Sequence, residues 1–183
     1  MNWLNTIIIL CAAFVAVFLE ASCDGFRRVF GAQIDLLPAL MVYASLRCEI
    51  VGVTLLATLG GLWYDTLSES PLGVSVLPLF IVGFLIFPRR GLILREQYYA
   101  RFILGLSASA LVPLLTLLML LSMRRAPLVG IGTVWQLIVM TVAGGLLTPV
   151  CFWVFDALNR ALSYRPAIES SFRPDRDIKR GRN

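Results

Sequence analysis

Residues 35–65 read DLLPALMVYASLRCEIVGVTLLATLGGLWYD, which places two apolar runs on either side of the polar triplet Arg47-Cys48-Glu49. As a helix, the first run (36–46) would extend only about 16 Å, whereas the hydrocarbon core of a bilayer is about 30 Å thick. The second run (50–64) is longer and rich in glycine. We therefore expect two helices joined by a very short connection, the first of them too short to cross a membrane unaided.

The whole chain is strongly apolar. Its 183 residues are 58% hydrophobic and 15% charged, whereas soluble domains are about 25% charged. A soluble domain of this size does not have enough interior to hide so much apolar surface. The net charge of +5 is not accompanied by a nucleic-acid-binding motif, so we expect no nucleic-acid partner. The composition indicates an integral membrane protein.

Four further apolar runs complete the pattern, at residues 3–19, 72–87, 102–123 and 131–155. No positive residue precedes the first run, so we interpret it as a retained helix and not as a cleaved signal. The six runs predict an all-α polytopic membrane protein whose transmembrane domain covers residues 1–162. A basic tail follows at residues 163–183.

The positions of Lys and Arg predict the orientation, because cytoplasmic loops are enriched in these residues. The arginine-rich segment 89–101 and the basic tail are expected in the cytoplasm. If all six runs span the membrane, both termini are cytoplasmic and four arginines lie outside: Arg27, Arg28, Arg124 and Arg125. If run 36–46 does not span, the N-terminus lies outside, and charge alone favours this five-span arrangement.

Residue types needed for most enzyme chemistry are missing. The chain has no His, which removes His-based metal sites and the Ser-His and Cys-His dyads. Its four cysteines form no C-x-x-C pair, and its only lysine, Lys179, lies in the tail. We therefore expect no catalytic activity, no metal and no cofactor, and the sequence favours binding or scaffolding.

Polar residues beside apolar runs are the candidates for function, because burying them is costly. We expect the Asp65 carboxylate to accept hydrogen bonds from N–H groups of the following turn, as a helix cap does, with a partner or a substrate cation as the alternative. Asp35 is interpreted as an N-cap, and Arg47 with Glu49 as solvated loop charges. Small residues let helices approach closely in lipid, and these glycines are expected to form grooves for a partner's helix: Gly52, Gly60, Gly61, Gly105, Gly144 and Gly145.

An ordered set of motifs lies within residues 35–75. A proline-containing run ends in Tyr43-x-x-Leu46, a glycine-rich run ends in Gly61-Leu62-x-x-Asp65, and a Pro71-Leu72-Gly73 turn follows. In this order and spacing the motifs resemble the rod shape-determining protein MreD family, although that family more usually has a glycine before the proline. As partner-binding or structural positions, the resemblance marks Pro38, Tyr43, Arg47, Gly52, Gly60, Gly61, Asp65, Pro71 and Gly73.

The resemblance implies a non-catalytic membrane scaffold of the bacterial cell-elongation machinery, which directs peptidoglycan synthesis in rod-shaped cells. It implies a place in the inner membrane and partners that include MreC, the complex of RodA with a class B penicillin-binding protein, and MreB indirectly. It also implies a six-transmembrane-helix bundle similar to the substrate-binding subunits of energy-coupling-factor transporters, and so favours six spans over five.

Two alternatives remain open at the level of sequence. The chain could instead be the substrate-binding subunit of a vitamin transporter, a function that needs a cavity with convergent polar groups. The tail at residues 163–183 is either an orientation signal with a disordered end or a site for anionic membrane lipids or a cytoplasmic partner.

Overall fold

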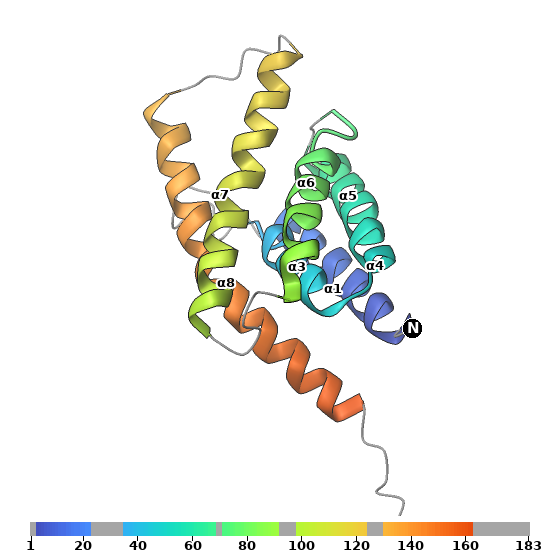
Figure 1. The fold of residues 1–183 in the computed structure, drawn as a ribbon. Coiled ribbons are helices and arrows are strands. Elements are labelled where there is room, and N and C mark those ends of the chain that lie inside the picture. The colour runs from blue at the N-terminus through green and yellow to red at the C-terminus, as the bar shows by residue number, and fades with distance from the viewer. Residues whose placement is uncertain (1–2, 23–34, 69–70, 92–97, 124–129, 163–183) are drawn as a thin grey trace, which may run out of the picture.

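The computed structural model describes residues 3–22, 35–68, 71–91, 98–123 and 130–162, and these ranges contain helices and turns but no strand (Figure 1). The elements are α1 (Trp3–Ser22), α3 (Leu37–Arg47), α4 (Ile50–Leu55), the π-helical turn η1 (Leu56–Gly60), α5 (Gly61–Leu67), α6 (Val76–Ile86), the 3-10 turn η2 (Phe87–Gly91), α7 (Tyr98–Ser122) and α8 (Ile131–Leu162). The prediction of an all-α protein is confirmed. The arginines of the two external loops and the basic tail lie outside the described residues.

Each apolar run of the sequence is helical in the structure, and α4, η1 and α5 follow one another as a single rod. Pro38 and Pro78 lie in the first turns of α3 and α6, where a missing N–H costs no helical hydrogen bond. Pro113 and Pro149 lie inside α7 and α8, and Figure 1 shows α8 changing direction partway along its length. An interior proline removes one backbone hydrogen bond and bends a helix in this way.

Four helical segments are long and apolar enough to cross a membrane: Asn5–Ser22, Ile50–Leu67, Tyr98–Ser122 and Gly132–Ala161. Helices α3 and α6 have 11 residues each, or about 16 Å, and do not reach that length. The membrane-helix character predicted from composition is confirmed for the four long segments. The number of spans stays a prediction.

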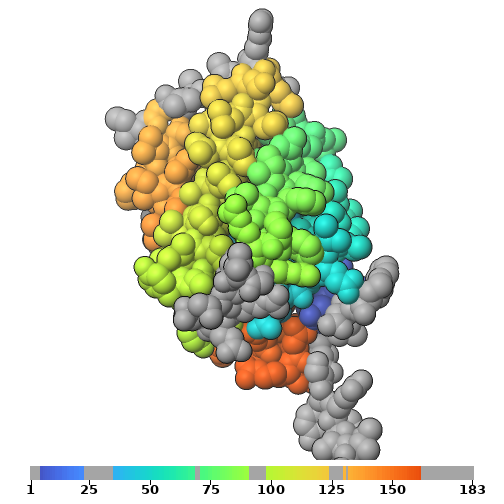
Figure 2. All heavy atoms as spheres, viewed as in Figure 1, coloured from blue at the N-terminus to red at the C-terminus, as the bar shows by residue number. Residues whose placement is uncertain are grey.

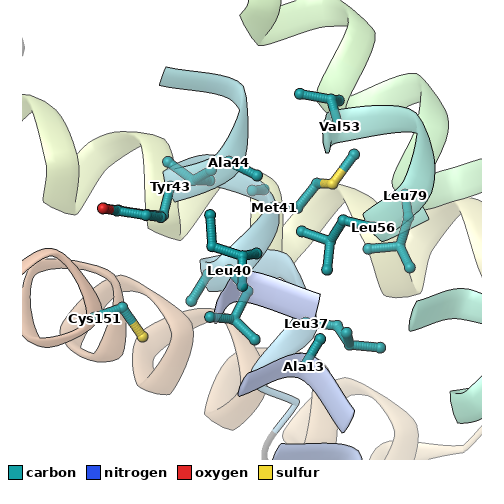
Figure 3. Packing of buried hydrophobic residues seen from close by; sticks show 14 of the residues in the cluster. Ala13, Leu37, Leu40, Met41, Tyr43, Ala44, Val53, Leu56, Leu79 and Cys151 are labelled. Atoms are coloured by element: carbon teal, nitrogen blue, oxygen red, sulfur yellow. The ribbon is translucent and has the colours of Figure 1, made fainter. Parts of the chain in front are cut away.

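Helix α3 is the centre of the molecule. Every residue from Leu37 to Leu46 is buried, which is typical of a helix that is enclosed by others. Helices α1, α6, α7 and α8 all contact it. Figure 3 shows Leu37 and Met41 of α3 among side chains from α1, α4 and α6. The helix that is too short to span therefore packs against protein along its whole length.

The helices alternate in direction, so their polar ends gather at two opposite ends of the molecule (Figure 1). At the first end, which we call the arginine end, Arg47 contacts α8 and Arg90 donates a hydrogen bond to the Cys48 carbonyl oxygen at 3.1 Å. At the second, the carboxylate end, Glu20 of α1 accepts a hydrogen bond from the backbone N–H of Leu36 at 2.6 Å. The N-terminus of α1 lies at the arginine end.

Helices α7 and α8 form an antiparallel hairpin with very close backbones. A Cβ added to Gly105 would overlap the Thr148 side chain, and one added to Gly144 would overlap Ser109. The Thr148 hydroxyl instead donates a hydrogen bond to the Gly144 carbonyl oxygen at 2.7 Å. In Figure 2, α7 lies between α8 and α6. The hairpin is thus one tightly packed unit beside the other helices.

Candidate functional site

Asp65, near the end of α5, is only 1% exposed. Its Oδ2 atom accepts a hydrogen bond from the Gly73 N–H at 2.7 Å, and its Oδ1 atom accepts one from the Ser75 N–H at 3.2 Å. These donors immediately precede α6, where helix N–H groups have no partner within the helix. The prediction that Asp65 accepts hydrogen bonds from the following turn is confirmed. The carboxylate binds this chain's own backbone.

The turn that Asp65 holds needs its glycine. Gly73 has a φ of +93°, a conformation that residues with a Cβ rarely adopt. The Pro71 carbonyl oxygen accepts a hydrogen bond from the Val74 N–H at 3.2 Å and closes the turn. Pro71 and Gly73, which carry part of the family resemblance, therefore shape the corner between α5 and α6.

The glycines of the third apolar run serve contacts within the chain. A Cβ added to Gly61 would lie 2.8 Å from the Val76 Cα, so α5 and α6 approach at backbone distance. A Cβ on Gly60 would lie 3.2 Å from the Leu37 side chain, and Gly52 faces the side chain of a residue in α1. Gly105, Gly144 and Gly145 likewise face the opposite helix of the hairpin. The prediction that these glycines form grooves for a partner's helix is wrong, because helices of the same chain fill the space.

Two carboxyl groups meet at the start of α3. Asp35 Oδ1 accepts a hydrogen bond from the Leu37 N–H at 2.9 Å, while Glu20 Oε1 binds the N–H of Leu36. Asp35 thus accepts a hydrogen bond from the first turn, but the N-cap residue is Leu36, so the prediction that Asp35 is the N-cap is wrong by one residue. Burial raises the pKa of Asp35 to about 6, against the opposing effect of its hydrogen bond. Glu20 was not recognised from the sequence, because it follows an apolar run of a different helix.

At the other end of α3, Tyr43 and Arg47 join the central helix to α8. The Tyr43 ring stacks on Phe155 with ring centroids 4.8 Å apart, and its hydroxyl accepts a hydrogen bond from Asn159 at 3.2 Å. Arg47 forms an ion pair with Asp156 at 3.2 Å. Arg47 is exposed, as predicted for a solvated charge, but it ends α3 instead of lying in a loop, and its ion pair with Asp156 of the long α8 was not predicted. Glu49 is exposed, as expected.

A second arginine contacts α8 in a way that the sequence did not reveal. Arg101 is 8% exposed, and its guanidinium lies 4.6 Å from the centroid of the Phe152 ring. A guanidinium over an aromatic face is stabilised by the charge distribution of the ring. Sequence reasoning placed Arg101 only within a basic loop. Its position four residues into α7 was the one signal that it faces a neighbouring helix.

The described arginines gather at one end of the molecule. All arginines among the described residues (Arg47, Arg89, Arg90, Arg101 and Arg160) belong to segments at the arginine end. At the carboxylate end the described ionisable side chains are Glu20, Asp35 and Asp65, together with the Tyr64 phenol. Within the described ranges, no three Cys, Asp or Glu side chains gather in a way that could hold a metal ion.

A cavity of about 320 Å³ opens beside this acidic group. It lies between the α3–α5–α6 corner and the α7/α8 hairpin. Its described lining includes the polar residues Asp35, Tyr64, Ser68, Ser75, Thr116, Thr133 and Gln136, and the other described lining residues are apolar. The Ser68 hydroxyl is buried without a hydrogen-bond partner among protein atoms. No sequence motif indicated this cavity, because its lining comes from five separate segments.

The fold and these sites define an all-helical protein with four membrane-spanning candidates and a buried central helix whose two ends carry opposite charge. No known protein family, no curated protein and no solved structure matches the chain.

Proposed function

We propose that this chain is a non-catalytic scaffold subunit of the bacterial cell-elongation machinery. In this role it binds MreC and the complex of RodA with a class B penicillin-binding protein, close to MreB filaments. The proposal rests on the motif resemblance of residues 35–75. It assigns the protein no reaction of its own.

One observation carries the proposal: the glycine-rich run and the turn of the motif are joined in space. The Asp65 carboxylate binds the backbone of the Pro71–Gly73 turn, and Gly61 sits against the backbone of α6. Tyr43 lies at the other end of the central helix, where it packs on Phe152 and Phe155 of α8. Buried contacts between the run and the turn are what a shared fold would impose on a family.

We further propose six spans with the arginine end in the cytoplasm. Arginine enrichment favours the cytoplasmic side, and this end gathers the described arginines. Helices α3 and α6 are short, but neighbours enclose α3, so its length need not match the lipid. A reporter fused to the N-terminus tests the topology: a cytoplasmic signal is expected, and an extracytoplasmic signal would refute six spans.

The scaffold role is tested in the native host by depletion and by purification. Depletion should convert rod-shaped cells into round cells, and MreC should co-purify with the tagged protein in mild detergent. The Asp65→Leu variant should fail to restore rod shape in depleted cells. Gly132→Ala is the control, because its added Cβ lies in open space, and it should restore rod shape. Cells that stay rod-shaped without any second copy of the gene would refute the proposal.

The vitamin-transporter alternative keeps one specific observation in its favour, which is the cavity of about 320 Å³ with several polar lining residues. A substrate-binding subunit needs a cavity with convergent polar groups. Tight, saturable binding of a vitamin to the purified protein, together with rod-shaped depleted cells, would promote this second function over the first.

A further inference from the structure

We propose that the cavity at the carboxylate end binds a small amphipathic organic cation, with its ammonium group on the Asp35 carboxylate and its apolar body against α7. The inference goes beyond the scaffold role and does not depend on it. The described residues that line the site comprise one acid, several hydroxyls and an apolar wall.

The shape of the cavity separates a polar side from an apolar side. Asp35, Tyr64 and Ser68 line it from the α3 and α5 segments. Opposite them, α7 contributes Leu117 and Leu120, while Leu37 and Leu79 supply further apolar walls. A pocket of about this volume, mostly apolar with a few convergent polar groups, is typical of small-molecule sites.

The polar side of the cavity can accept hydrogen bonds from a positively charged ligand. One oxygen of Asp35 accepts a hydrogen bond from the Leu37 N–H, and none of the described lining residues is an arginine. The other carboxylate oxygen of Asp35, Oδ2, can accept a hydrogen bond from an N–H group of a ligand in the cavity.

The sign of the ligand charge follows from the same groups. Asp35 is the acidic residue among the described residues that line the cavity. Burial raises the pKa of Asp35 because its charged form is poorly compensated there. An ammonium group compensates that charge, whereas a phosphate or carboxylate would be repelled. Apolar walls then select an organic cation over a hydrated metal ion.

The experiment uses the full chain in nanodiscs and 2-phenylethylamine as the probe, at a pH well above the pKa of Asp35. Binding is measured by calorimetry, with 2-phenylethanol as the uncharged analogue of the same shape. The amine should bind saturably, and the alcohol should bind about tenfold more weakly, since loss of one charge-assisted hydrogen bond is worth about 1.4 kcal/mol or more. Equal binding of the two compounds would overturn the proposal.

Two variants and one matched control locate the site. Asp35→Asn keeps the side-chain shape and should weaken amine binding at least about tenfold, while Thr116→Phe should block it by filling the cavity from α7. Glu49→Gln removes the same charge from an exposed side chain at the arginine end and should leave binding unchanged. If the amine binds Asp35→Asn and Thr116→Phe as it binds the parent, both monodisperse, then it partitions into lipid and the proposed site is refuted.

Discussion

Arg47 of α3 and Asp156 of α8 form a 3.2 Å ion pair across 109 positions of the sequence. Their side chains are 36% and 28% exposed, so solvent screens the pair. Together with the Tyr43–Asn159 hydrogen bond, the pair fastens the central helix to α8 at the arginine end. At the other end of α3, a cavity separates the same two parts of the molecule.

We first predict a small coupling energy between Arg47 and Asp156. A double-mutant cycle with Arg47→Gln and Asp156→Asn should give about 0.2–1 kcal/mol, because exposed ion pairs contribute little. Unfolding in mixed micelles measures the four free energies. A coupling of about 3 kcal/mol, as found when a buried pair is broken, would contradict the solvated geometry.

Loss of the Asp65 carboxylate should be far more costly. Asp65→Ala leaves the N–H groups of Gly73 and Ser75 without an acceptor, so we expect a loss of about 2–4 kcal/mol in the free energy of unfolding. Asp65→Asn keeps one acceptor oxygen and should lose less. Equal stability of the alanine variant and the parent would show that the turn does not need this acceptor.

The α7/α8 contact should not tolerate a single added methyl group. Gly105→Ala and Gly144→Ala each place a Cβ into a side chain of the opposite helix, and overpacking of this kind costs about 1–3 kcal/mol. Gly132→Ala on α8 is the matched control, because no atom lies within 4 Å of its added Cβ. Thermal unfolding should rank both packed variants below the control, and the reverse order would be inconsistent with the close crossing.

The contribution of Asp35 should make the free energy of unfolding fall as the pH rises towards neutrality. Its folded-state pKa is raised to about 6 from 3.8, so the folded protein binds the proton more tightly than the unfolded chain does. The contribution is therefore fully present below pH 3.8 and is lost as pH rises through about 6.

The pH effect is isolated by comparison with Asp35→Asn, measured as unfolding free energy across this window. Glu20 of α1 and Tyr64 and Asp65 of α5 are the described titratable groups that face the site, and they are common to both proteins. The difference between the two proteins should change most between pH 3.8 and about 6. A constant difference throughout would mean that Asp35 titrates normally.

The helices could be predicted from the sequence because each apolar run is bounded by charged residues, prolines or glycines. The role of Asp65 was predictable for a related reason, since its hydrogen-bond donors follow within ten residues of it. Contacts between distant segments were not predictable. Nothing local to Arg47 indicates Asp156, and nothing local to Asp35 indicates Glu20 or the cavity.

The glycines show most clearly what could not be predicted from the sequence. Their small size correctly indicated close approach of helices, but it could not indicate whether the approaching helix belongs to this chain or to a partner. Gly105 and Gly144 turned out to face one another's helices, and only the three-dimensional arrangement distinguishes the two cases.

The full burial of α3 also constrains the order of assembly. An 11-residue helix offers the lipid too little apolar length to be held there alone, so α3 depends on its neighbours for a stable position. Yet Asn159 and Asp156, which bind its Tyr43 and Arg47, belong to the last described helix. During synthesis α3 is therefore made early, but Arg47 obtains its counter-ion Asp156 only after α8 has been synthesised. The contacts of the central helix are completed last.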